Sequence, residues 1–329
     1  MIRLMRIQVI GAGSWGLALA RLLANNGHPV RLWCREEDHP TALRETRESP
    51  AFLPGVLLPR GVEVVRDVDP DAEMAVFAVP SHAMRAVAAQ FLFSSRTIRV
   101  SVAKGIENDT LLRMSQVVEE VAPGGPIVAL SGPTHAEEVG HDLPASLVAA
   151  GLSEAARVQV QDAFFSKRFR VYTSPDIIGV ELGGALKNVV AIAAGVCDGF
   201  ELGDNAKAAL ITRGLAEIAR LGVACGANPL TFAGLSGMGD LIVTCASRHS
   251  RNRHVGECIA HGQGLEAILA GMKMVAEGVR TTQSANALAR RHGVEMPIAQ
   301  ATYHVLFEGG DARRAIETLL VREAKPEPG

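Results

Sequence analysis

Residues 7–20 read IQVIGAGSWGLALA, a short apolar run that leads into a glycine-rich turn and the start of a helix. The turn has the spacing Gly-x-Gly-x-x-Gly, formed by Gly11, Gly13 and Gly16. At such a turn the first glycine allows the tight bend, the second lets the backbone approach a pyrophosphate, and the third lets helix and strand pack closely. The N-terminus of the helix then faces the phosphate charge. Because the motif opens a repeating strand–helix pattern, it predicts a site for NAD or NADP.

The first half of the chain alternates short apolar runs with helix-like segments, which is typical of a parallel sheet with crossover helices. The predicted strands are Ile7–Ile10, Val30–Trp33, Met74–Val79, Ile98–Val102, Ile127–Leu130, Ser146–Ala149 and Phe169–Tyr172. Beyond about Pro175 the pattern is helical, and the predicted helices are Glu181–Val196, Ala206–Leu221, Arg251–His261, Thr282–Arg291 and Ile298–Glu308. We therefore expect an α/β fold with a Rossmann-like, doubly wound, mostly parallel sheet in residues 1–178 and an all-helical domain in residues 179–329.

Composition narrows the class of protein. A length of 329 residues suits about two domains, and a net charge of −2 argues against a nucleic-acid partner. We expect no membrane insertion, because no run approaches about 18 uncharged apolar residues, and the N-terminus shows no apolar signal core. The five cysteines include no Cys-x-x-Cys pair, which indicates reduced thiols and neither a zinc site nor a disulfide framework. These features predict a cytoplasmic protein without a bound metal.

Three strand ends have unusual sequences. Ligands of doubly wound sheets bind beyond the carboxyl ends of the strands, where this chain has Pro80-Ser-His82, Ala103-Lys104-Gly105 and Ser131-Gly-Pro-Thr-His-Ala136. A lysine at a strand end is commonly only solvated. Its position on the same edge as the glycine turn nevertheless favours a functional role for Lys104.

The segment Glu181–Gly195 is apolar on nearly every side, which predicts a buried helix, and Lys187 is its single cation. Its neighbours at helical spacing are mostly small, among them Gly183, Gly184 and Ala191, so a ligand could fit beside it. A buried ammonium without a partner is costly or loses its proton. Lys187 is therefore a candidate proton donor and acceptor, the alternative being a lysine that reaches water or a structural carboxylate.

Two later segments contain a candidate carboxylate and a candidate binding site for an anion. We expect Leu235–Leu241 to form a flexible turn that presents the Asp240 carboxylate. Ser250 is a suitable N-cap, so Arg251 and Asn252 would lie in the first turn of the next helix. Backbone amides and a guanidinium there favour a phosphate. The alternative is a capped, basic helix start that only faces solvent.

Arg35 follows the second strand, where an NAD-specific site usually has an acidic residue. An arginine can accept a 2′-phosphate, which is compatible with NADPH, while a solvated surface arginine is the alternative. The choice between NAD and NADP stays open.

Longer motifs continue along the chain: FLPG at 52–55, AVPSH at 78–82, KGIE at 104–107, SGPT at 131–134, ALKNVVAIAAG at 185–195, DNAKAALITRGLAEIARLG at 204–222, GMGDLIVTC at 237–245 and SRNR at 250–253. Through these motifs, which are spread over essentially the whole chain, the sequence resembles the bacterial NAD(P)-dependent glycerol-3-phosphate dehydrogenases. The resemblance implies a Rossmann domain followed by a helical domain of the 6-phosphogluconate dehydrogenase C-terminal type, in a protein expected to be a homodimer. It also implies an oxidoreductase that reversibly reduces glycerone phosphate to sn-glycerol 3-phosphate for phospholipid biosynthesis.

The resemblance also implies a role for each matching residue, with Lys187 as the general acid and base. The implied substrate-binding residues are Lys104, Gly132, Thr134, Lys187, Asp240, Ser250, Arg251 and Asn252. The implied cofactor-binding residues are Gly11, Gly13, Ser14, Trp15, Gly16, Arg35, Lys104, Ala136, Arg251, Val275 and Glu277. His135 departs from the family pattern, which usually has an apolar aromatic residue at that position.

Two other functions fit parts of the same pattern. A related two-domain dehydrogenase of hydroxy acids or sugar acids would need the lysine but would bind a carboxylate in place of the phosphate. A non-catalytic NADP(H)-sensing regulator would keep the fold but would need neither Lys187 nor the anion-binding helix start. Turnover of glycerone phosphate, compared with that of 2-oxo and 3-oxo acids, separates the three hypotheses.

Overall fold

The computed structural model describes residues 3–38 and 40–320 of the chain. Its first half contains one eight-stranded sheet in the order β3-β2-β1-β4-β5-β6-β7-β8. The strands are β1 Ile7–Ile10, β2 Val30–Trp33, β3 Val62–Val65, β4 Met74–Phe77, β5 Ile98–Ser101, β6 Ile127–Ser131, β7 Ala145–Ala150 and β8 Phe169–Ser174. All neighbouring strands are parallel except β6 and β7. The predicted fold class is therefore confirmed, while β3 was not predicted.

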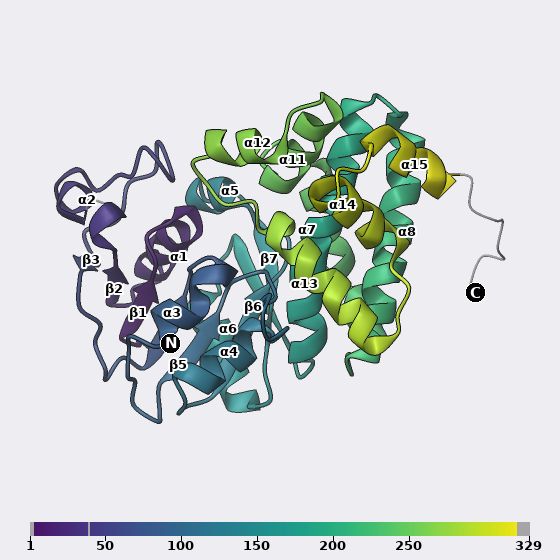
Figure 1. Ribbon diagram of the computed structural model, residues 1–329. Helices are drawn as coiled ribbons and strands as arrows, with labels where there is room; N and C mark the ends of the chain where they lie inside the picture. The colour runs from purple at the N-terminus through teal and green to yellow at the C-terminus, as the bar shows by residue number, and fades with distance from the viewer. Residues whose placement is uncertain (1–2, 39, 321–329) are drawn as a thin grey trace.

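The strand order places a crevice in the middle of the sheet. From β1 the chain adds β2 and β3 on one side and then returns to add β4 and the later strands on the other. Ligands of such sheets bind at this switch point, beyond the carboxyl ends of the strands. The helices of this half are α1 Ser14–Asn25, α2 Pro40–Thr46, α3 Met84–Ala88, α4 Met114–Val121, α5 Ala136–Gly140 and α6 Glu154–Phe164. Figure 1 shows them around the sheet.

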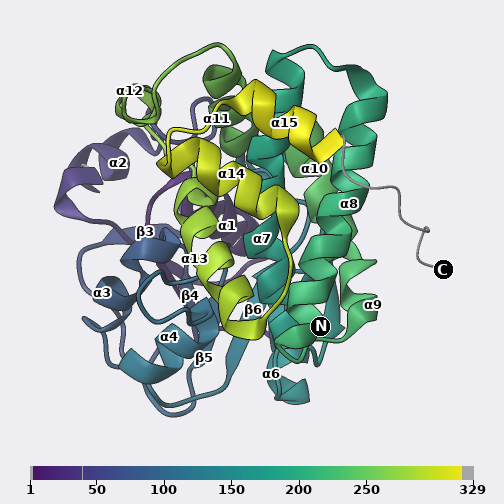
Figure 2. The same ribbon diagram turned by 45° about the vertical axis from the view of Figure 1, so that its right-hand side comes forward.

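The second half is built around one long helix, α7 (Ile177–Gly199), which carries apolar or small side chains on nearly all sides and is buried along most of its length. The elements that follow it are α8 Gly203–Ala224, α9 Pro229–Phe232, η3 Leu235–Gly239, α10 Asp240–Ala246, α11 Arg251–Ala260, α12 Leu265–Gly271, α13 Glu277–His292, α14 Pro297–Phe307 and α15 Ala312–Leu320. Among them α8, α10, α11 and α13 pack directly on α7 (Figures 1 and 2). The proposed domain division at residues 178/179 falls within the first turn of α7 and stays a prediction.

Buried polar contacts join the two halves. Glu181, in the second turn of α7, accepts hydrogen bonds from the backbone N–H of Ser115 at 2.7 Å and from its hydroxyl at 2.6 Å, and it pairs with Arg113. Arg113 and Ser115 lie at the start of α4. The contact fixes the position of α7 relative to the sheet.

Among the described residues, two segments are long and apolar enough to cross a membrane by length and composition alone. One is α7, but 89% of its most apolar 18-residue window is buried inside the protein. The other, Pro229–Ala246, is 39% buried and consists of α9, η3 and α10. The apolar composition of α7 is accounted for by its place in the core.

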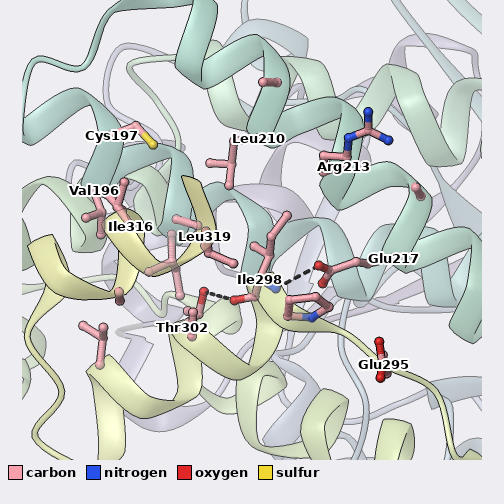
Figure 3. A pocket seen from close by; sticks show the side chains of 18 of the residues that line it. Val196, Cys197, Leu210, Arg213, Glu217, Glu295, Ile298, Thr302, Ile316 and Leu319 are labelled. Atoms are coloured by element: carbon pink, nitrogen blue, oxygen red, sulfur yellow. Dashed lines mark hydrogen bonds between the residues drawn. The ribbon is translucent and has the colours of Figure 1, made fainter. Parts of the chain in front are cut away.

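A large cavity of about 1210 Å³ lies between α7, α8, α14 and α15, with mostly apolar walls. Figure 3 shows its lining, with Glu217 of α8 accepting a hydrogen bond from the backbone N–H of Ile298 at 2.8 Å. None of the site residues expected from the sequence lines this cavity. The volume of a cavity alone therefore does not identify the candidate active site.

Candidate active site

A smaller cleft of about 440 Å³ opens at the carboxyl ends of the central strands and reaches α7 and α11. The predicted site residues that line it are Gly11, Gly13, Ser14, Trp15, Arg35, Lys104, Thr134, Ala136, Lys187, Ser250, Arg251, Asn252, Val275 and Glu277. The remaining predicted residues are Gly16, Gly132 and Asp240, which contact residues of this lining from behind. The structure thus brings together side chains from both halves of the chain.

The glycine turn after β1 has the geometry that a dinucleotide requires. Gly11 has φ +110°, and a Cβ there would lie 2.7 Å from the carbonyl oxygen of Ala78. A Cβ on Gly16 would lie 1.9 Å from the carbonyl oxygen of Gly11, so only glycine lets α1 pack this closely. No side chain of the described residues caps the N-terminus of α1 at Gly13. The first-turn amides are therefore available to a pyrophosphate, and the turn fits the group.

The Ser14 hydroxyl holds neighbouring segments. It donates to the carbonyl oxygen of Phe52 at 2.6 Å and approaches the Met274 sulfur at 3.0 Å. Phe52 and Met274 both line the cleft, as does Trp15, whose ring packs against the core of the sheet. Any contact of Ser14 with a cofactor phosphate would therefore be made by its backbone amide.

Arg35 lies at the rim of the cleft and is half exposed. Its guanidinium is paired with Asp38, with Nε–Oδ2 and Nη2–Oδ1 distances of 3.1 and 3.0 Å. Asp38 belongs to the short 3₁₀ helix η1, Glu36–Asp38. A 2′-phosphate would have to compete with this carboxylate, so the contact does not decide between NAD and NADP.

Glu277 closes the cleft from the side of α13. Its carboxylate accepts hydrogen bonds from the backbone N–H of Ser81 at 2.8 Å and from the Ser81 hydroxyl. A Cβ on Gly105 would meet both side chains, with its nearest contact to the Ser81 hydroxyl. Val275, two residues before Glu277, is 37% exposed at the edge of the cleft.

Two lysines share one buried carboxylate at the inner end of the cleft. Asp240 is fully buried and accepts a hydrogen bond from Lys104 Nζ at 2.8 Å and another from Lys187 Nζ. Lys104 Nζ also donates to the carbonyl oxygen of Gly132 at 2.8 Å, and Lys187 Nζ donates to the Thr244 hydroxyl at 2.6 Å. Lys187 therefore meets a carboxylate, as one alternative from the sequence anticipated, but it does so at the wall of the cleft.

Burial sets the proton affinity of Lys187. The side chain is 6% exposed, and the pKa of its ammonium group is lowered from 10.5 to about 7, with loss of solvent as the largest cause. That value already includes the opposing effect of the Asp240 carboxylate, which raises the pKa, and the positive charge of Lys104, which lowers it. An amine with a pKa near neutrality can both donate and accept a proton at physiological pH.

The expected flexible turn at Leu235–Leu241 is wrong. Residues Leu235–Gly239 form a π-helical turn, and Asp240 is the first residue of helix α10. A Cβ on Gly237 would lie 2.2 Å from the carbonyl oxygen of Phe232. The glycine therefore serves close packing rather than mobility, and this packing holds Asp240 in place.

The start of α11 has the predicted geometry. The Ser250 hydroxyl accepts a hydrogen bond from the backbone N–H of Arg253 at 3.2 Å, so Ser250 is the N-cap of α11. The Arg251 side chain lines the cleft and has no hydrogen bond or ion pair within the described part of the chain. Asn252 differs, because its amide donates to Asn188 Oδ1 at 2.9 Å and accepts from the backbone N–H of Gly278 at 2.9 Å.

The loop after β6 completes the wall of the cleft. The Thr134 hydroxyl donates to the carbonyl oxygen of Gly132 at 3.1 Å, and Ala136 begins α5. His135, between them, also lines the cleft, with its ring centroid 5.9 Å from that of His249.

Two residues that line the cleft were not assigned to the site from the sequence. Asn188 donates a hydrogen bond to the carbonyl oxygen of Lys104 at 3.1 Å and accepts one from Asn252, so it links the lysine pair to α11. Its position directly after Lys187 on an apolar helix was the available signal. Thr244 holds Lys187 from one helical turn beyond Asp240, and that spacing places both side chains on the same face of α10.

Family models match both halves of the chain: the N-terminal model of NAD-dependent glycerol-3-phosphate dehydrogenase matches residues 6–157, and the C-terminal model matches residues 176–317. The chain is 51% identical over 325 residues to the glycerol-3-phosphate dehydrogenase [NAD(P)+] of Pelotomaculum thermopropionicum, covering 96% of this chain and 93% of the relative. It is 49% identical to the Bacillus subtilis enzyme of the same name, covering 96% and 94% of the two chains. The crystal structure of glycerol-3-phosphate dehydrogenase from Coxiella burnetii superposes with a TM-score of 0.93 at 35% identity, covering 97% of this chain and 99% of the other.

Proposed function

The chain belongs to the NAD-dependent glycerol-3-phosphate dehydrogenase family, and from this premise we propose that it catalyses the reversible NAD(P)H-dependent reduction of glycerone phosphate to sn-glycerol 3-phosphate. The observation that carries the proposal is a buried lysine with a pKa of about 7 in the same cleft as Arg251, which has no hydrogen bond or ion pair to the described residues. An ammonium and an anion-binding helix start are the two groups that a phosphorylated ketone needs.

The bound nicotinamide supplies the hydride that reaches the carbonyl carbon. In the protein, Lys187 Nζ donates its proton to the carbonyl oxygen during reduction and takes it back during oxidation. Asp240 and Thr244 hold the amine in place through the hydrogen bonds described above. Lys104 contacts the same carboxylate and lines the cleft, so its charge favours the oxyanion that develops on the substrate.

The phosphate is held at the N-terminus of α11. The backbone amides of Arg251 and Asn252 lie in the first turn, where no intrahelical acceptor is available to them. The Arg251 guanidinium adds a fork-shaped donor suited to two phosphate oxygens. Because the side chains of Ser250 and Asn252 are engaged in the protein, their role is to shape this turn.

The Gly11–Gly16 turn and the N-terminus of α1 hold the pyrophosphate, and Arg35 and Glu277 contribute from the two sides of the cleft. NADPH use depends on Arg35 exchanging Asp38 for a 2′-phosphate. We further propose a cytoplasmic homodimer that supplies glycerol 3-phosphate for phospholipid biosynthesis. The cysteines support this location, since no disulfide joins any of them within the described residues.

A spectrophotometric assay tests the proposal. Purified protein is mixed with NADH or NADPH and with glycerone phosphate, or with a panel of 2-oxo and 3-oxo acids that lack a phosphate. Rapid cofactor oxidation with glycerone phosphate alone is the expected result. Preferred turnover of an oxo acid would favour a hydroxyacid dehydrogenase, and no oxidation with any substrate would favour an NADP(H) sensor.

A further inference from the structure

His135 lies in the cleft but takes no part in the chemistry described above. It is half-buried, it immediately precedes α5, and its ring is inclined by 50° to that of His249. His249 directly precedes Ser250, the N-cap of α11. The imidazole of His135 therefore lies beside the helix start that binds the phosphate.

The Nε2 atom of His135 is buried and has no hydrogen-bond partner among the described residues. Buried polar atoms in folded proteins are nearly always paired, so an orphaned one calls for a missing partner. His28 provides the contrast within this chain. Its Nδ1 accepts from the backbone N–H of Met5 at 3.1 Å, and its Nε2 lies 3.2 Å from the carbonyl oxygen of Ala163. Since His135 lines the cleft, a bound ligand is the natural source of its partner.

The charges around His135 determine its protonation state and therefore the kind of ligand group that it can bind. Burial lowers the pKa of His135, and the nearby Lys187 and Lys104 ammonium groups lower it further. The imidazole is therefore neutral near pH 7 and offers one N–H donor. A neutral donor adds a hydrogen bond to an anion without placing a third positive charge beside the lysines.

We propose that His135 donates a hydrogen bond from Nε2 to the phosphate of the bound substrate and so positions it. The inference rests on the proposed function. The carbonyl oxygen of the substrate is assigned to Lys187, and the phosphate lies at the start of α11, next to the His135–His249 ring contact. His135 and Arg251 then bind the same phosphate from two different segments of the chain.

The test compares His135→Phe with His135→Gln. Phenylalanine keeps the ring and removes the nitrogen, whereas the glutamine amide offers a donor at a similar distance from the backbone. We expect His135→Phe to raise KM for glycerone phosphate about tenfold, the effect of losing one hydrogen bond to a charged group, with kcat within about twofold of wild type. His135→Gln should recover most of the loss. His141→Phe, an exposed histidine just beyond the same helix α5, is the matched control and should leave KM unchanged.

A calorimetric titration with glycerol 3-phosphate in the presence of NADP+ supplies a readout independent of turnover. His135→Phe should weaken its Kd about tenfold as well. An unchanged KM and Kd would overturn the inference, as would a fall in kcat and Tm with KM preserved. If wild-type protein oxidises no cofactor with glycerone phosphate, the proposed function fails, and the titration alone decides the role of His135.

Discussion

Replacement of Lys187 by methionine tests the proposed chemistry most directly. Methionine fills a comparable volume but cannot exchange a proton. The variant should remain folded, because Asp240 keeps its contact with Lys104 at 2.8 Å and is not left as an unpaired buried charge. Thr244 also keeps its hydrogen bond to the backbone oxygen of Asp240 at 2.6 Å. A loss of activity would then report the missing amine and not a collapsed site.

The magnitude follows from the role and the pKa of Lys187. A positioned general acid contributes about 10²–10⁴-fold, or about 3–5 kcal/mol of activation free energy, so kcat for reduction should fall by that factor. With a pKa of about 7, roughly half of the wild-type amine is protonated at pH 7 and about 1% at pH 9. Reduction needs the protonated amine, so its rate should fall as pH rises above 7. Oxidation needs the neutral amine, so its rate should fall as pH drops below 7.

The assay measures kcat in both directions from pH 5.5 to 9.5, with binding of NADPH followed by fluorescence. The variant should lose both pH limbs and bind the cofactor normally. Lys167→Met, at an exposed lysine remote from the cleft, serves as the control and should behave as wild type. A Lys187→Met enzyme that keeps more than about a tenth of its turnover, or that keeps the limb near pH 7, would remove Lys187 from the proton transfer.

Asp240→Asn should move the pH limb of ketone reduction to lower pH, because the carboxylate raises the pKa of Lys187; an unmoved midpoint in the pH–rate profile would contradict this. Arg251→Ala should raise KM for glycerone phosphate tenfold or more with a smaller effect on kcat, and substrate saturation curves with an unaltered KM would place the anion site elsewhere. Gly195→Ala would put a Cβ 1.9 Å from the carbonyl oxygen of Arg253. It should lower the free energy of unfolding by about 1–3 kcal/mol, which a thermal melt would show as a lower Tm. Gly271→Ala, where a Cβ meets nothing within 4 Å, should change Tm far less.

Most of the sheet could be predicted because its parallel strands are buried on both faces and therefore read as continuous apolar runs. The missed strand β3 has an exposed charged residue, Glu63, within its apolar run. The antiparallel pairing of β6 with β7 could not be predicted, since strand direction is set by the path of the connection and not by side-chain pattern.

The candidate site likewise has parts that the sequence predicted and parts that it did not. Lys187 could be predicted because a lone cation on an apolar helix has few structural explanations. The geometry that holds it could not, because the glycines before Asp240 read as a flexible turn. In the structure one of them, Gly237, allows contact between backbones, because a Cβ there would lie 2.2 Å from the carbonyl oxygen of Phe232. A sequence does not distinguish a glycine that makes the backbone flexible from a glycine that allows two segments to pack closely.

The contact between α7 and α11 has a consequence for substrate choice. The two helices touch at the backbone, where a Cβ on Gly195 or Gly256 would lie 1.9 or 2.0 Å from a carbonyl oxygen of the other helix. Lys187 is carried by α7 and Arg251 by α11, so this contact sets the distance between the backbones of the two residues. Under the proposed function, a sugar phosphate with a longer carbon chain between its carbonyl and its phosphate should therefore fit the cleft less well than glycerone phosphate does.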